Sequence, residues 1–204
     1  MSVEDRYFDG LFANSDDPWA FRQRWYEQRK RAITLAALPR PRYRAIFEPG
    51  CANGELSADL ATRCDRLLCC DTASAAVALA RTRLSPFNHA QVCQARLPEQ
   101  WPSEKFDLIV ISELGYYLDA EDLKRLIEQA SQSLTADGQL LACHWRPPID
   151  GCPLNARQVH DLLHEHLRLP RLVLHQDADF LLELWSREPR SVAALEGLRA
   201  STCN

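Results

Sequence analysis

Short apolar segments alternate with longer segments of helical periodicity along most of this chain, and this alternation limits the possible folds more than any other feature. Three predicted helices, at about 54–64, 73–84 and 120–134, lie among five segments with the length and composition of buried strands. Such an order is typical of a parallel sheet with helices on both faces. Asp137 and Gly138 are expected to end the third helix before the fifth strand. The strands are expected at 43–48, 66–70, 90–95, 106–112 and 138–145.

The pattern changes after the fifth predicted strand. A helix is expected at about 155–166, and the apolar segments 171–177 and 179–187 follow it with almost no residues between them. A parallel crossover needs a dozen or more residues, so these two segments are expected to form an antiparallel hairpin at the sheet edge. The predicted fold is therefore α/β, a Rossmann-like, doubly wound sheet of seven mostly parallel strands. The tail, residues 189–204, is expected to be peripheral or a short helix.

The first forty residues precede the alternation, and we expect residues 1–40 to form a helical lid on a core domain of residues 41–188. Asp17 suits a helix N-cap, Pro18 the first helical position and Pro39 a position beyond the end, which predicts one helix at about 18–38. Its apolar face should pack on the core domain and comprises Phe21, Trp25, Ala32 and Leu35 or Ala36. The neighbouring face, with Trp19, Tyr26 and Lys30, is either a solvated surface or the inner side of a lid.

Charge and composition exclude several kinds of partner. The 204 residues have a formal net charge of -4, and apart from RQRWYEQRKR the Lys and Arg residues are scattered, so no nucleic-acid surface is expected. The first ten residues are charged and no apolar run approaches the ~18 residues of a membrane span, which favours the cytoplasm. The eight cysteines form no CxxC pair and are expected to be reduced and structural, with no metal site. The oligomeric state is expected to be a monomer or a dimer.

The turn FEPGCANG, after the first predicted strand, indicates a ligand that approaches bare backbone. Gly50 and Gly54 permit that approach, but the turn is neither a Walker A loop nor a GxGxxG motif. The carboxylate of Glu48 disfavours phosphate and favours a cation, while Asp71, at the end of the second strand, can accept from both hydroxyls of a ribose. A ribose and a positive charge without phosphate indicate S-adenosylmethionine. The alternative is that the glycines only make a tight turn and Asp71 only caps the next helix.

Three segments carry a resemblance to a known family. FEPGCANG, CCDTASAAVALAR and FDLIVISELGYYL resemble the first, second and fourth motifs of class I S-adenosylmethionine-dependent methyltransferases, over about residues 43–187. Within that class, DPWAFRQRWYEQRKR, SELGYYL and HWRPP resemble the nodulation protein S group. Members of that group N-methylate a deacetylated amino sugar at the end of a chitooligosaccharide. The resemblance thus implies an amino sugar or a related oligosaccharide as the methyl acceptor.

The resemblance also implies which residues bind the cofactor. Ala52 replaces a glycine of many relatives, and we expect the turn to accept it only with a negative φ. Arg96 stands where an acidic residue usually accepts from the adenine amino group, so we expect backbone groups of residues 95–97 to hold the adenine, with Arg96 stacked on it. The expected methionine-binding residues are Glu48, Gly50, Ala52 and Gly54, the expected ribose-binding residues are Asp71 and Thr72, and the remaining expected contacts are Tyr26, Lys30, Cys51, Ala95, Arg96, Leu97 and Ser112.

Methyl transfer from a sulfonium depends mainly on alignment, but an amine acceptor must first lose a proton. Glu113 and His144 end the fourth and fifth predicted strands and are the candidate bases. Alternatively, Glu113 caps the following segment or binds cofactor, and His144 is a satisfied histidine at the rim.

The candidate acceptor-binding residues follow the same two strands. Tyr116 and Tyr117 are either an aromatic wall for the acceptor or part of the core, and Trp145 begins a loop that should form another wall. Arg146 either holds an acidic acceptor or pairs with a surface carboxylate. O-methylation of a hydroxyl or carboxyl group, and a SAM-binding module without turnover, remain as alternatives to N-methylation.

Overall fold

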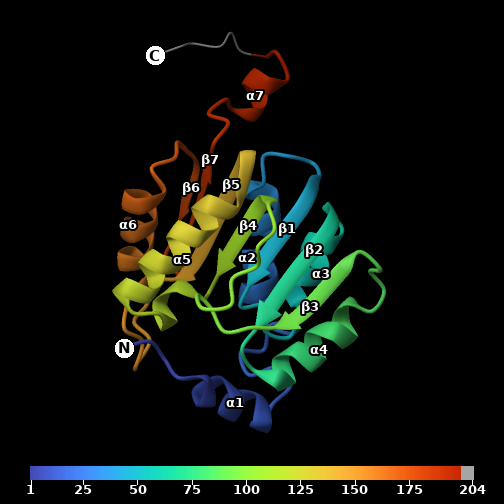
Figure 1. Ribbon diagram of the computed structural model, residues 1–204, viewed down its shortest axis with the longest axis vertical. Helices are drawn as coiled ribbons and strands as arrows, with labels where there is room; N and C mark the ends of the chain where they lie inside the picture. Colours follow the sequence, from blue (N-terminus) through green and yellow to red (C-terminus); the bar gives the residue numbers. More distant parts are fainter. Residues whose placement is uncertain (199–204) are drawn as a thin grey trace.

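The computed structural model describes residues 1–198, and within them a seven-stranded sheet forms the centre of the molecule (Figure 1). The strand order is β3-β2-β1-β4-β5-β7-β6, in which β3, β2, β1, β4 and β5 are parallel and β7 is antiparallel to both its neighbours. The predicted mostly parallel sheet with a C-terminal hairpin is confirmed. The strands are β1 (Tyr43–Pro49), β2 (Cys64–Asp71), β3 (Ala90–Gln94), β4 (Phe106–Ser112), β5 (Leu134–Trp145), β6 (Arg171–Gln176) and β7 (Phe180–Ser186).

Helices cover both faces of the sheet. On one face α3 (Glu55–Ala61) contacts both α2 (Trp25–Ala37) and α4 (Ser74–Leu84). On the other, α5 (Ala120–Ser133) packs against α6 (Ala156–Leu167). Figure 1 shows α5 and α6 in front of the sheet and α2 and α3 behind it.

The central strand β4 shows how one sequence serves two cores. All its residues except Ser112 are buried, and successive side chains point to opposite faces. Ile109 and Ile111 pack with α5 and α6, whereas Leu108 and Val110 pack with α3 and α4. Each such aliphatic side chain contributes roughly 1.5–3 kcal/mol when fully buried. This two-sided burial explains why the strand is a continuous apolar run.

Local signals set several helix ends. Asp119 caps α5 by accepting from the amides of Glu121 and Asp122, and Asn155 forms a capping box with Gln158 at the start of α6. The predicted end of α5 at Asp137 and Gly138 is wrong. The helix ends at Ser133 and β5 begins at once, so these two residues lie inside the strand.

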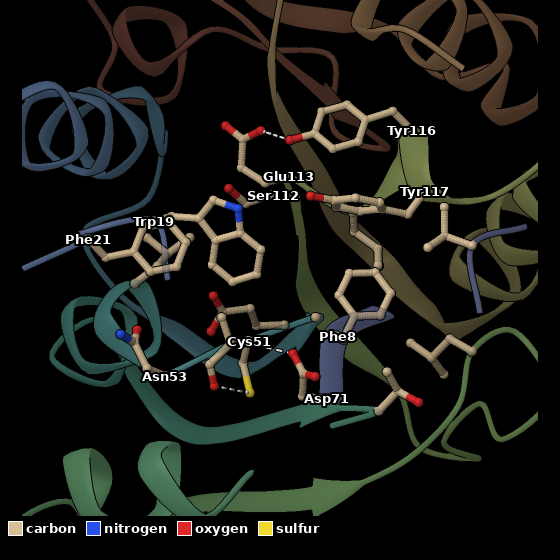
Figure 2. A pocket seen from close by; sticks show the side chains of 18 of the residues that line it. Phe8, Trp19, Phe21, Cys51, Asn53, Asp71, Ser112, Glu113, Tyr116 and Tyr117 are labelled. Carbon is tan, nitrogen blue, oxygen red and sulfur yellow. Dashed lines mark hydrogen bonds between the residues drawn. The ribbon is translucent and has the colours of Figure 1, made fainter. Parts of the chain in front are cut away.

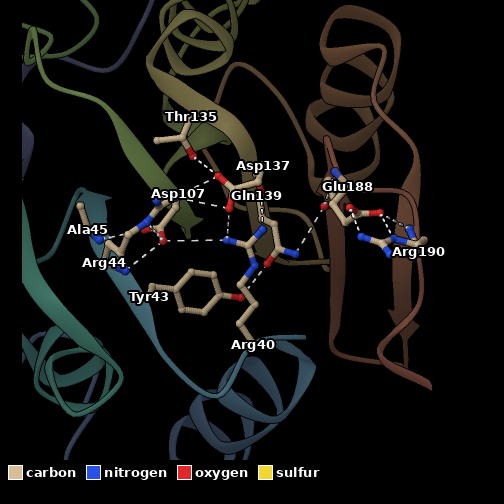
Figure 3. Close-up of polar contacts among 11 residues, drawn as sticks. Arg40, Tyr43, Arg44, Ala45, Asp107, Thr135, Asp137, Gln139, Glu188 and Arg190 are labelled. Carbon is tan, nitrogen blue, oxygen red and sulfur yellow. Dashed lines mark hydrogen bonds and ion pairs between the residues drawn. The ribbon is translucent and has the colours of Figure 1, made fainter. Parts of the chain in front are cut away.

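A polar network at the amino ends of the strands accommodates this early start of β5. The register of β4 on β5 shifts between Phe106 and Leu108. Asp107, between them, turns its carboxylate to the backbone amides of Arg44 and Ala45, at 2.9 and 2.8 Å (Figure 3). Asp137 then pairs with Arg40 and Arg44, which explains its place in a strand rather than at a helix end.

The N-terminal region differs most from the prediction. The helix expected at 18–38 begins only at Trp25, because Ala20 adopts a left-handed φ of +58° that a helix cannot contain. Asp17 instead caps the preceding turn by accepting from the amides of Phe21 and Arg22. A further helix, α1 (Asp5–Asn14), was not predicted and lies beneath the carboxyl ends of the strands (Figure 1).

The buried face of α2 also differs from the predicted apolar face. Trp25 is 73% exposed, whereas Glu27, Lys30 and Thr34 are buried. The face that carries Tyr26 and Lys30 therefore points inward.

The short helix α7 (Val192–Leu195) projects beyond the opposite end of the sheet, and residues 199–204 of the expected tail lie outside the described part. None of the helices in residues 1–198 has both the length and the apolar character needed to cross a membrane. The seven cysteines in this part of the chain are free.

Candidate active site

A cavity of about 400 Å³ lies at the carboxyl ends of the parallel strands, between the sheet and the N-terminal elements (Figure 2). Three of the predicted site residues, Gly54, His144 and Arg146, do not line it. The structure brings the others together around the cavity, namely Tyr26, Lys30, Glu48, Gly50, Cys51, Ala52, Asp71, Thr72, Ala95, Arg96, Leu97, Ser112, Glu113, Tyr116, Tyr117 and Trp145.

The turn after β1 is fixed by hydrogen bonds to β2. The amides of Gly50 and Cys51 donate to the carbonyl of Cys70, and the amide of Ala52 donates to Oδ2 of Asp71 at 2.9 Å. Oδ1 of Asp71 accepts from the amide of Ala73 at 3.0 Å. The expected negative φ of Ala52 is wrong: φ is +48°, a conformation that costs an alanine roughly 1–2 kcal/mol. Its hydrogen bond to Asp71 helps to hold that strained residue in place.

The two glycines of this turn meet different neighbours. A Cβ at Gly50 would lie 3.2 Å from Cδ1 of Leu114, which also lines the cavity, so a side chain there would crowd Leu114. A Cβ at Gly54 would lie 3.1 Å from Cα of Ala80. Gly54 therefore allows α4 to approach the turn, and it also has a left-handed φ of +83° immediately before α3.

Two carboxyl groups flank the turn, that of Glu48 buried and that of Asp71 half-buried. Glu48 is 3% exposed and accepts from Oγ of Ser57, and burial raises the pKa of Glu48 to about 8. Burial likewise raises the pKa of Asp71, although three backbone amides oppose this shift. A cationic group placed beside either carboxylate would compensate for the lost hydration.

A second charged cluster lies at the ends of β4 and β5. Oε1 of Glu113 accepts from Nζ of Lys30 at 2.7 Å, and Oε2 accepts from the hydroxyl of Tyr116 and from the amide of Trp145, the latter at 3.0 Å. Nζ of Lys30 also lies 3.1 Å from Oε2 of Glu27. Figure 2 shows the carboxylate of Glu113 directed at the Tyr116 hydroxyl. Glu113 has a φ of +55°, so a strained backbone supports this arrangement.

Burial and ion pairing oppose each other in this cluster. Burial alone would lower the pKa of Lys30, but Glu113 and Glu27 more than offset that effect, and the pKa lies above its usual value. Burial raises the pKa of Glu27, and Lys30 opposes the shift only in part. One ammonium group thus faces two carboxyl groups, and the site favours a further cation.

His144 and Arg146 lie away from the cavity. The His144 ring is fully buried, with Nε2 3.1 Å from the Gly115 amide and Nδ1 3.0 Å from Nε2 of His160. Burial and the neighbouring His160 lower its pKa well below the usual value. Arg146 borders a second cavity, and its guanidinium donates to the carbonyl of Asp177.

At the other end of the cavity, Arg96 pairs with Asp5 of α1 at 3.0 Å, and its amide donates to the side chain of Gln100. The guanidinium is thus tied to α1. Sequence reasoning missed α1, which contributes Phe8 and Phe12 to the lining. Trp19 and Phe21 also line the cavity, but they precede α2 instead of lying within the expected helix. The spacing of Phe8 and Phe12, four residues apart, was the available signal for an amphipathic helix.

Two polar atoms of the lining lack partners among the described residues. The hydroxyl of Tyr26 and Oδ1 of Asn53 are both buried and accept or donate no hydrogen bond. Buried polar groups are seldom left unpaired, so these atoms fit a polar ligand inside the cavity. The lining, with acidic side chains at Glu48 and Asp71 and aromatic walls, suits a cationic nucleoside such as S-adenosylmethionine.

The fold and this cavity define a class I S-adenosylmethionine-dependent methyltransferase. The sequence profile of nodulation protein S (NodS) matches residues 11–169, and the chain belongs to that family. Nodulation protein S of Bradyrhizobium diazoefficiens USDA 110 is 31% identical over 128 residues, which is 62% of this chain and 61% of that protein. The protein of the same name from Rhizobium tropici is 29% identical over 62% of this chain and 54% of its own length. The matches thus span little more than half of these curated relatives.

Solved structures agree with this assignment. N-methyltransferase NodS from Bradyrhizobium japonicum WM9, in complex with S-adenosyl-L-homocysteine, superposes with a TM-score of 0.78 at 26% identity, over 89% of this chain and 96% of that chain. A candidate methyltransferase from Pseudomonas syringae is 67% identical, with a TM-score of 0.73 over 80% of this chain and 99% of that chain.

Proposed function

We propose that this protein transfers a methyl group from S-adenosylmethionine to the amine of a small acceptor, an amino sugar or a related sugar-derived amine. The observation that carries this proposal is the cluster of Glu27, Lys30 and Glu113 at one end of the cavity, where two carboxyl groups face one ammonium group. An amine acceptor is a cation before it reacts, and this excess of carboxylate attracts it. The same charge repels a carboxylate acceptor.

The turn after β1 provides the cofactor end of the site. Bound S-adenosylmethionine would supply an electrophilic methyl group on a positively charged sulfur. Each carboxylate oxygen of Asp71 uses one lone pair on a backbone amide, which leaves acceptor capacity for the ribose hydroxyls. Glu48 lines the cavity beside the turn, and the ammonium group of the methionine part would favour its ionised form over the protonated form that burial favours. The aromatic side chains of Trp19 and Phe21 would cover the ligand and exclude water.

Glu113 is our candidate for the group that takes the proton from the acceptor. A carboxylate has roughly four lone-pair positions, and those of Glu113 receive Lys30, Tyr116 and the amide of Trp145. One position is left for the ammonium group of the acceptor. Once the proton has moved, the nitrogen lone pair can be aligned with the methyl group, and alignment contributes most of the acceleration.

The aromatic residues around Glu113 support a sugar-derived acceptor. The ring of Tyr26 lies edge-on to that of Trp145 with centroids 5.1 Å apart, and Tyr116 lies edge-on to Tyr117 with centroids 5.0 Å apart. Such walls suit the apolar face of a sugar ring or a cationic amine. The NodS family membership and the N-methyltransferase activity named for the Bradyrhizobium japonicum relative support the same choice.

Transfer of an isotope-labelled methyl group tests this proposal. A matched pair of acceptors, a deacetylated amino-sugar oligomer and its fully N-acetylated form, differs in the free amine alone, and a sugar acid supplies a carboxylate. We expect label on the deacetylated acceptor only. Label on the acetylated sugar or on the acid would show O-methylation. Binding of S-adenosylhomocysteine without transfer to any of the three would favour a module without turnover.

We also propose a cytoplasmic location, which the seven free cysteines of the described chain support.

A further inference from the structure

A chain of polar side chains runs from the edge of the sheet to the turn behind the cavity. Arg171 of β6 pairs with Oε1 of Glu183 on β7. Oε2 of Glu183 lies 2.7 Å from Nδ1 of His160, a residue of α6 that is 2% exposed. Nε2 of His160 lies 3.0 Å from Nδ1 of His144, and Nε2 of His144 lies 3.1 Å from the amide of Gly115. Neither histidine lines the first cavity.

The donors and acceptors in this chain fix the position of every ring proton. An amide can only donate, so Nε2 of His144 accepts from Gly115 and the His144 proton is on Nδ1. That proton is donated to Nε2 of His160, whose own proton is therefore on Nδ1 and is donated to Glu183. For His144, a single ring proton agrees with the lowered pKa of this buried side chain.

At the other end of this hydrogen-bonded series, the lack of a side chain at Gly115 lets His144 approach the backbone. A Cβ at Gly115 would lie 3.0 Å from Nε2 of His144 and 2.5 Å from Cγ1 of Val159, so a side chain at this position would push His144 away. Gly115 begins the turn Gly115–Tyr117, and that turn carries Tyr116, whose hydroxyl donates to Glu113. The amide held by His144 therefore lies in the short segment that links the two residues at the acceptor end of the cavity.

We propose that His160 is a positioning residue for the methyl-transfer site. By accepting from Nδ1 of His144, it fixes the tautomer whose Nε2 holds the Gly115 amide, and so keeps Tyr116 on Glu113. The effect on turnover rests on the proposed function, because it requires Glu113 to act on the acceptor. The effect on the tautomer and on the turn does not.

Two variants of His160 distinguish the effect of its hydrogen bonds from the effect of its packing. In His160→Gln, the amide oxygen can accept from His144 and the amide nitrogen can donate to Glu183, whereas His160→Phe fills the space and can do neither. Nitrogen-15 NMR of the His144 ring reports the tautomer, and hydrogen exchange reports the Gly115 amide. In the phenylalanine variant we expect the Nδ1–H tautomer to lose its dominance and the amide to exchange about 10-fold faster. In the glutamine variant both should stay near wild type.

Kinetics with the labelled acceptor complete the test. His160→Phe should lower kcat about 10-fold while the KM for S-adenosylmethionine stays unchanged, because only the acceptor end is disturbed. His160→Gln should recover most of the rate. His166→Phe, at an exposed position of the same helix, is the control and should match wild type.

An unchanged His144 tautomer and Gly115 exchange in a folded His160→Phe protein would overturn the proposal, as would a changed tautomer with unchanged kcat. Failure of the wild-type protein to methylate an amine would instead reject the proposed function, while the NMR result would still decide the role of His160 in the turn.

Discussion

The ammonium group of Lys30 lies 2.7 Å from Oε1 of Glu113, and this buried ion pair joins α2 to the carboxyl end of β4. Lys30 is 5% exposed and the Glu113 side chain is 19% exposed, so the ammonium end of the pair is shielded from water. Buried pairs are costly to break from one side, because the remaining charge has no partner. We infer that α2 is a fixed wall of the cavity, and that any closing movement belongs to α1 and the segment before α2.

Removal of this ammonium group should destabilise the protein. We expect Lys30→Met to lower the free energy of unfolding by about 3 kcal/mol, because it leaves the carboxyl groups of Glu27 and Glu113 without a counter-charge. Arg29→Met is the matched control: Arg29 is also on α2, but its pair with Asp177 is partly exposed, and the loss should be below about 1 kcal/mol. Urea denaturation measures the free energy of unfolding of both variants. Equal losses would show that the Lys30–Glu113 pair stabilises the protein no more than the partly exposed Arg29–Asp177 pair.

The raised pKa of Glu48 predicts how stability depends on pH. The folded protein retains a proton on Glu48 up to about pH 8, whereas the unfolded chain releases it near the ordinary value of 4.5. The stability contributed by this group is therefore fully present below the unfolded pKa and is lost as pH rises through the folded pKa, with a slope of at most about 1.4 kcal/mol per pH unit.

Glu48→Gln has nearly the same shape and cannot titrate, so it should remove this part of the pH dependence. Urea denaturation of both proteins at several values between about pH 5 and 8 gives the two slopes. Parallel curves for wild type and variant would mean that Glu48 is charged throughout in the folded protein.

Movement of the N-terminal region is best tested by hydrogen exchange. If α1 and residues 15–24 close over the cofactor while α2 stays anchored by Lys30, S-adenosylhomocysteine should slow exchange across residues 5–24 more than across residues 25–37. Uniform slowing across both segments would indicate general stabilisation. Greater slowing in α2 would support the original expectation that this helix is the lid.

Much of this architecture follows from short-range patterns in the sequence. The strands were predictable because apolar runs such as 106–112 must be buried on both faces, and the glycine turn was predictable because Gly50 needs a left-handed φ of +73°. The irregular start of β5 was not, because it depends on Asp107 and its contacts with the backbone at 44–45, more than sixty residues earlier in the chain.

Some site residues were likewise predictable from the sequence, and others were not. Glu113 and Trp145 line the cavity, but His144 points to the other face of the sheet because successive residues of a strand alternate. Leu140 and Ala142, two and four residues before His144, point to the face of the sheet that α5 and α6 cover. Counting every second residue of β5 from them would have placed His144 on the same face, beside α6. Glu27 was missed because the inward face of α2 is polar, and a polar stripe carries no signal of burial.

Glu113 is proposed to take a proton from an amine acceptor, and the pH profile of Glu113→Gln tests this role. Glutamine preserves the shape and removes the proton acceptor, so turnover on the deacetylated amino sugar should fall by about 10²-fold at neutral pH and recover in part as pH rises and free amine accumulates. The Kd for S-adenosylhomocysteine, measured by calorimetry, should stay near wild type. Turnover equal to wild type across the whole pH range, with the cofactor bound normally, would contradict this role of Glu113 and show that the site works by alignment of an amine already deprotonated in solution.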